Sequence, residues 1–76
     1  MIIKILGAGC SNCKKLYHNA LLAIAEKGID AEVIKVTDYS EIADYNVMRT
    51  PALVIDDKVV SYGKVASKEE ILEFLN

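Results

Sequence analysis

Apolar residues near the start of the chain predict one strand followed by one helix. Residues 1–6 (MIIKIL) form an apolar run broken only by Lys4, as expected for a strand buried on both faces. A helix is predicted from residue 10 or 11 to about Lys27, because apolar side chains there recur every three or four positions. Gly28 follows as a helix C-cap. The predicted buried stripe of this helix comprises Cys13, Leu16, Tyr17, Ala20, Leu21 and Ile24.

The middle of the chain predicts a second strand and a short helix. Residues 31–36 (AEVIKV) have the composition of a strand. Asp38 and Glu41 resemble a capping box that opens a helix reaching about Tyr45. Asn46 can close that helix in a left-handed conformation.

The last third of the chain predicts a hairpin and a final helix. Residues 52–55 and 58–61 are two short strands joined at the pair Asp56 and Asp57. Ser67 caps the final helix, and Glu70 completes its S-x-x-E capping box. The expected buried face of this helix comprises Ile71, Leu72, Phe74 and Leu75.

The resulting order of elements is β-α-β-α-β-β-α, which predicts an α/β fold with a four-stranded mixed sheet and helices on both faces. The first two strands should be parallel, since a strand, helix and strand at this spacing form a right-handed crossover. The hairpin adds two antiparallel strands. With 76 residues the chain is expected to form a single domain, 1–76.

Composition and charge narrow the classes of partner. The chain is 53% hydrophobic and 26% charged, which is typical of a globular protein. Its net charge is −2 and no basic stripe follows any face, so neither nucleic acid nor membrane is an expected partner. No apolar run approaches transmembrane length. We expect a cytoplasmic monomer.

The only two cysteines, in the stretch GAGCSNCKKL, are the strongest candidates for chemistry. A helix that begins at Cys10 places Cys13 one turn later on the same face, within reach of a disulfide. The unpaired N–H groups at the helix start favour the Cys10 thiolate, whereas burial favours the neutral Cys13 thiol. One reactive thiolate beside one shielded thiol is typical of thiol–disulfide exchange.

Two other functions use the same residues. Two thiolates suit Cu(I), so a soft-metal binding or carrier module is the main alternative. A zinc site requires four ligands, and beyond the cysteines the chain offers only His18, on the polar face of the helix. A scaffold that binds peptides without turnover is a further alternative.

Three stretches resemble a known family. GCSNC (residues 9–13), YNVMRTPAL (45–53) and SYGKVASKEEILEFL (61–75) are similar to the active-site motif, the cis-proline loop and the last helix of thioredoxins. The chain thus resembles a minimal thioredoxin/glutaredoxin-like protein of the group called redox-active disulfide protein 2. A minimal thioredoxin-like fold over nearly the whole chain is what this resemblance implies.

The resemblance also implies roles for particular residues. Cys10 would be the nucleophile and Cys13 the resolving thiol of a redox-active disulfide, with no bound cofactor. Pro51 would be the cis-proline, the backbone of Thr50 would pair with an extended client, and Gly63 would line the same groove. The implied activity is reduction of disulfides in client proteins, with a thioredoxin-reductase-type donor regenerating the dithiol. Electron transport and cell redox homeostasis are the corresponding processes.

The sequence departs from the family pattern near the thiols. Ser11 and Asn12 occupy the positions between the cysteines, which tune the redox potential in the family. Lys4 stands where thioredoxins carry a buried carboxylate. We expect its ammonium to reach solvent at the sheet edge, although a cation near the thiols would favour thiolates. Lys14 and Lys15 could add positive potential near Cys10, contact an acidic partner, or simply be solvated.

Overall fold

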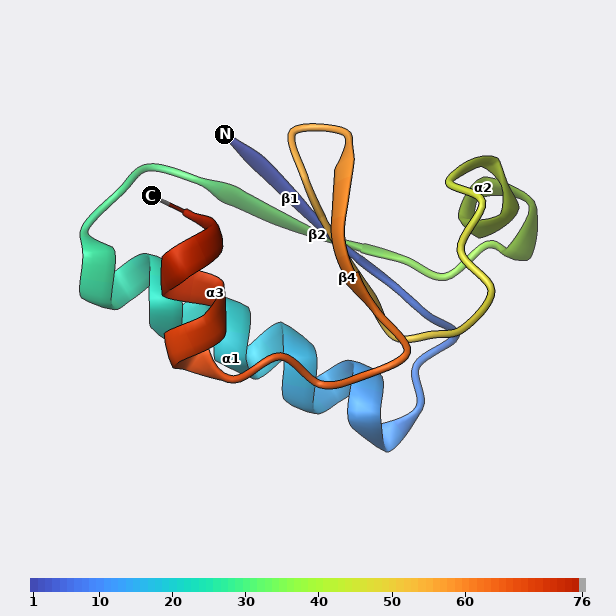
Figure 1. Ribbon diagram of the computed structural model, residues 1–76, viewed down its shortest axis with the longest axis horizontal. Helices are drawn as coiled ribbons and strands as arrows, with labels where there is room; N and C mark the ends of the chain where they lie inside the picture. The colour runs from blue at the N-terminus through green and yellow to red at the C-terminus, as the bar shows by residue number, and fades with distance from the viewer. Residues whose placement is uncertain (76) are drawn as a thin grey trace.

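The computed structural model describes residues 1–75, which form four strands and three helices in the predicted order (Figure 1). The elements are β1 (Ile2–Leu6), α1 (Ser11–Lys27), β2 (Glu32–Val36), α2 (Tyr39–Asp44), β3 (Ala52–Ile55), β4 (Lys58–Tyr62) and α3 (Lys68–Phe74). The predicted α/β architecture is therefore confirmed.

The four strands form one mixed sheet in the order β2-β1-β3-β4. β1 runs parallel to β2, with Ile3 opposite Val33. β3 is antiparallel to both β1 and β4. The parallel first pair and the antiparallel hairpin agree with the prediction, and β1 and β3 are the two central strands.

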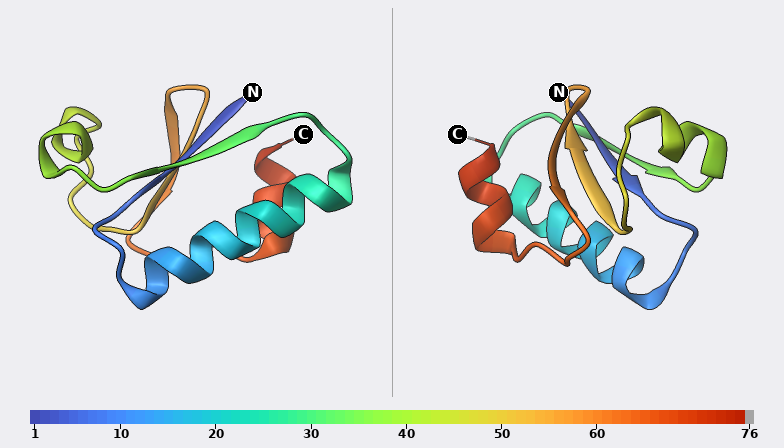
Figure 2. Two further views of the ribbon diagram at one scale, coloured as in Figure 1. Left: turned by 180° about the vertical axis from the view of Figure 1, so that it is seen from behind. Right: turned by 45° about the vertical axis from the view of Figure 1, so that its right-hand side comes forward.

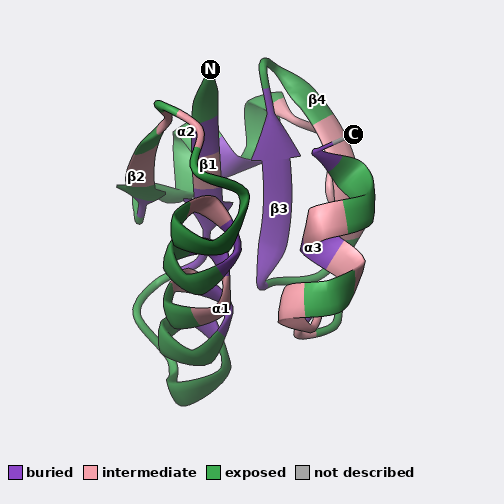
Figure 3. Cartoon of the chain, turned by 90° about the vertical axis from the view of Figure 1, so that its left-hand side faces the viewer, coloured by how far each residue is buried: buried purple, intermediate pink, exposed green. Residues whose placement is uncertain are grey.

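The helices cover both faces of the sheet. α1 and α3 lie side by side on one face, and α2 lies on the other, toward one end (Figure 2). β3 is buried along its whole length because residues on its two sides face different helices (Figure 3). The core under α1 and α3 comprises Ile3, Ile5, Leu16, Ala20, Ala23, Leu53, Ile55, Ala66, Ile71 and Leu75. The core under α2 is smaller: Leu6, Val36, Ile42, Ala52 and Val54.

Local sequence signals account for the ends of most elements. Gly28 closes α1 in the left-handed region, with φ of 68°. Asp56 and Asp57 both have positive φ, 48° and 67°, which is the geometry of a tight two-residue hairpin turn. Ser67 and Glu70 exchange the two reciprocal bonds of a capping box, each 3.1 Å long.

Three details differ from the prediction. The buried stripe of α1 passes through Ala23 and leaves Leu21 42% exposed, because only a narrow row of the helix is buried: Cys13, Leu16, Ala20 and Ala23. Phe74 is 38% exposed, since α3 buries Ile71 and leaves Phe74 near its outer side. The carboxylate of Asp38 accepts the N–H of Ser40 instead of forming a capping box with Glu41.

Gly7 connects β1 to the loop before α1. It determines how closely the first turn of α1 approaches the end of β1. Its N–H donates to the carbonyl of Val36 at 2.9 Å, and the residue is buried. A Cβ atom at this position would overlap Cys13 Sγ and would lie 3.8 Å from Cβ of Thr50. Only glycine therefore lets the Cys13 side chain pack directly on the backbone.

We predict that Gly7→Ala lowers the free energy of unfolding by about 1–3 kcal/mol, the usual cost of an extra methyl group in a packed core. The cause is the overlap between the new Cβ and the sulfur of Cys13. Urea unfolding followed by circular dichroism measures the effect. Ala8→Ser, a change of similar size at the exposed neighbouring residue, should leave the unfolding midpoint in place. An unchanged midpoint in Gly7→Ala would contradict the packing argument.

Candidate functional site

The two cysteines occupy chemically different positions at the start of α1. Cys10 is the N-cap residue, has extended backbone geometry and is exposed. Cys13 lies in the first turn, is only 5% exposed and packs beneath the helix. The backbone N–H of Cys13 donates to Cys10 Sγ at 3.3 Å, so the thiol of Cys10 performs the capping that a serine or aspartate usually provides. Both thiols are reduced.

The surroundings move the pKa values of the two thiols in opposite directions. A hydrogen bond from the Cys13 thiol lowers the pKa of Cys10, and backbone N–H groups at the helix start add to this effect. Burial raises the pKa of Cys13, and its hydrogen bond to Cys10 raises that pKa further. Of the two thiols, Cys10 is therefore the one that loses its proton first as the pH rises.

The loop before β3 lies next to the thiols. The Thr50–Pro51 peptide bond is cis, with Pro51 buried and Thr50 exposed. The N–H of Gly63 donates to the carbonyl of Pro51 at 3.0 Å. Gly63 has a positive φ of 72°, so it also serves as the turn glycine after β4.

The fold thus brings together the residues selected from the sequence, at the start of α1 and on the loops before β3 and after β4. The close approach of Gly7 to both Cys13 and Thr50 joins the thiol loop to the cis-proline loop. The backbone hydrogen bond from Gly63 to Pro51 places Gly63 beside the cis-proline loop as well. The remaining two selected residues, Ser11 and Asn12, are exposed in the first turn of α1.

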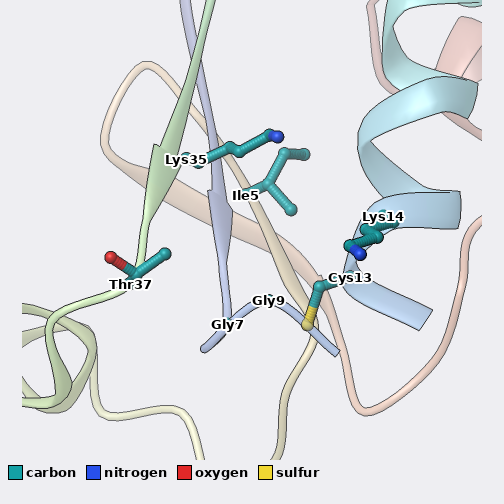
Figure 4. Close-up of a pocket in the computed structure, with 7 residues that line it drawn as sticks. All are labelled: Ile5, Gly7, Gly9, Cys13, Lys14, Lys35 and Thr37. Atoms are coloured by element: carbon teal, nitrogen blue, oxygen red, sulfur yellow. The ribbon is translucent and has the colours of Figure 1, made fainter. Parts of the chain in front are cut away.

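A small cavity of about 60 Å³ borders the buried thiol (Figure 4). Lys35 and Thr37 reach it from the β2 side, and Lys14 lies on the helix opposite. The ammonium of Lys35 lies 4.4 Å from the centroid of the Tyr17 ring. The residues that line the cavity are Ile5, Gly7, Gly9, Cys13, Lys14, Lys35 and Thr37.

Lys4 does not extend to the sheet edge, contrary to the prediction. β1 is a central strand, so the side chain instead crosses the face that α2 covers. Its ammonium donates to the hydroxyl of Tyr45 at 2.7 Å and lies 3.8 Å from a carboxylate oxygen of Asp57. The hydrogen bond with Tyr45 is the main cause that raises the pKa of Lys4.

Within residues 1–75, no group of three or more His, Cys, Asp or Glu side chains is arranged to hold a metal ion. The cysteine pair therefore offers two thiolate donors without a third ligand of these types. No helix in this part of the chain is both long and apolar enough to cross a membrane.

Two residues at the site were not selected from the sequence. Gly7 had a usable signal, because a glycine directly after a buried strand often marks a close backbone approach. Arg49 had none. Its side chain lies over Gly63, where an added Cβ would stand 3.2 Å from Arg49 Cβ.

Comparison with known proteins agrees with this geometry. The family described as thioredoxin domain matches residues 1–76. The chain is similar to a thioredoxin of Methanocaldococcus jannaschii, with 48% identity over 75 residues, covering 99% of this chain and 86% of the relative. It is also similar to a thioredoxin of Methanothermobacter thermautotrophicus, with 42% identity over 76 residues, covering 100% and 99%. The chain therefore belongs to the thioredoxin family, a family of thiol–disulfide oxidoreductases, and has a minimal form of its fold.

Proposed function

We propose that the protein reduces disulfides in client proteins, with Cys10 as the nucleophile and Cys13 as the resolving thiol. The observation that carries this proposal is the inequality of the two sulfurs. Cys10 is exposed and has a lowered pKa, whereas Cys13 is buried and has a raised pKa. A pair that served only as packing residues would need neither the exposure nor the hydrogen bond between the thiols.

The exchange transfers two electrons in two displacement steps. The Cys10 thiolate attacks one sulfur of the client disulfide, and the other client sulfur leaves as a thiolate. Cys13 then loses its proton to solvent and attacks Cys10 Sγ, so that the second client thiolate leaves. The client gains two electrons and two protons to become a dithiol, and Cys10 and Cys13 become a disulfide.

The cis-proline loop supplies the proposed client-binding surface. Thr50 is exposed directly beside the thiols, so its backbone can pair with an extended client segment as an added short strand. Pro51 and Gly63, whose backbones share a hydrogen bond, are the residues proposed to line the same groove. Ser11 and Asn12, between the cysteines, are the positions proposed to tune the redox potential.

The cycle requires an external electron donor. We assign this part to a thioredoxin-reductase-type protein, which returns two electrons to the Cys10–Cys13 disulfide, so that no bound cofactor is needed. The reducing cytoplasm is the proposed compartment, because there a cysteine pair at this spacing is more often catalytic than structural. The Cu(I) alternative keeps its two thiolate donors, and no cluster of three or more His, Cys, Asp or Glu side chains within residues 1–75 supports it.

Substitution of each cysteine should separate the two steps. Cys10→Ser should reduce turnover of a disulfide substrate to the uncatalysed rate, because the attacking sulfur is lost. Cys13→Ser should block turnover but accumulate a mixed disulfide at Cys10, because resolution is lost. Mass spectrometry under non-reducing conditions, with a synthetic disulfide peptide as substrate, distinguishes these outcomes. Retention of wild-type turnover by both variants would refute the mechanism.

The pH dependence of alkylation should report the lowered pKa of Cys10. Because iodoacetamide reacts with the thiolate, the rate should rise with pH through a midpoint below the free-cysteine value of about 8.5. In Cys13→Ala the midpoint should move upward, since the main cause of the lowered pKa is the hydrogen bond from Cys13. Cys13→Ser keeps a hydroxyl donor and should shift the midpoint less. Identical midpoints in wild type and Cys13→Ala would contradict this cause.

A further inference from the structure

Positive charge is concentrated at the end of the molecule that carries the thiols. Four segments meet there: residues 7–15, 36–38, 47–51 and 62–66. Asp38 is the only one of the 11 Asp and Glu residues within these segments, and its carboxylate caps α2, although the chain as a whole has a net charge of −2. The cations within the segments are Lys14, Lys15, Arg49 and Lys64.

Most of these cations form no ion pair within residues 1–75. Lys64 forms an ion pair with Glu70 at 2.6 Å. In contrast, no salt bridge joins Lys14, Lys15 or Arg49 to a carboxylate within residues 1–75. Three uncompensated positive charges therefore remain around Cys10 and Thr50, and a partner of opposite charge would complement them.

Arg49 is the cation placed closest to the proposed client groove. It directly precedes Thr50, and its aliphatic stem packs over Gly63, where a Cβ would meet Arg49 Cβ at 3.2 Å and Cδ at 3.3 Å. The N–H of Gly63 in turn donates a hydrogen bond to the carbonyl of Pro51. The stem therefore lies against the loop after β4 and beside Thr50, where a client strand is proposed to pair.

We propose that this cationic end selects clients whose disulfide is flanked by Asp or Glu, and that Arg49 is a specificity-determining residue. The inference rests on the proposed function, since it concerns the clients of the same site. A guanidinium binds a carboxylate through paired hydrogen bonds, whereas an ammonium acts as a point charge. Lys14 and Lys15 act at longer range by accelerating encounters with acidic clients and slowing those with basic ones.

The test uses three synthetic peptides that each contain one disulfide and differ only in flanking Glu, Gln or Lys residues. Pre-reduced protein is mixed with each peptide, and the second-order rate constant of the first turnover is measured. The expected order is Glu above Gln above Lys, and higher ionic strength should narrow the differences. Arg49→Gln should slow reduction of the Glu peptide about two- to five-fold more than it slows reduction of the Gln peptide, the range for one exposed ion pair.

A matched control removes the same charge at the opposite end of the sheet. Lys58 begins β4 beside the Asp56–Asp57 turn and is exposed, so Lys58→Gln should preserve the order of the three peptides. The triple variant Lys14→Gln, Lys15→Gln, Arg49→Gln should abolish that order while still reducing the Gln peptide.

The possible outcomes separate the inference from the function on which it rests. Equal rate constants for the Glu and Lys peptides in the wild type would overturn the inference and leave the reductase function intact. A preference that persists in the triple variant, or is lost equally in Lys58→Gln, would also overturn it. Failure to reduce even the Gln peptide would instead reject the proposed function, and the client selection with it.

Discussion

The contact between the Cys13 sulfur and the backbone of Gly7 is the constraint on which the site depends. It sets the distance between the start of α1 and the end of β1, because any side chain at position 7 would meet that sulfur. The same contact buries Cys13 while Cys10 stays exposed at the helix cap. It also brings Thr50 within reach of the thiol loop. The absence of a side chain at Gly7 thus allows the Cys13 thiol to be buried and the loop that carries Thr50 to lie beside it.

The difference between the pKa values of the two thiols arises largely without a neighbouring charged side chain. No charged side chain is buried among residues 1–75, and Lys4 is bonded to Tyr45 on the α2 face. The lowered pKa of Cys10 comes first from its hydrogen bond with Cys13 and then from backbone N–H groups. The opposite shift of Cys13 comes first from burial. The hydrogen bond between the thiols, backbone N–H groups and desolvation therefore account for the difference between the two pKa values.

Features set by neighbouring residues were predictable from the sequence, whereas those set by packing were not. The order of elements, the Ser67 cap, the Asp56–Asp57 turn and the unequal environments of Cys10 and Cys13 each follow from a few adjacent positions. The exposure of Leu21 and Phe74, and the partners of Lys4 and Arg49, depend on which distant segment packs nearby. Periodicity shows that a helix has an apolar face, but not how wide a strip of that face its neighbours cover.

The unequal cores on the two sides of the sheet have a consequence for local unfolding. The α2 side buries five residues in its core and the α1 side ten, and α2 has only six residues. A helix this short depends almost entirely on its packing, so we expect its amide hydrogens to exchange with solvent sooner than those of α1. α2 leads directly into the loop that ends at Pro51. The segment proposed to receive clients therefore adjoins a helix that we expect to open more easily than α1, whose start holds both sulfurs.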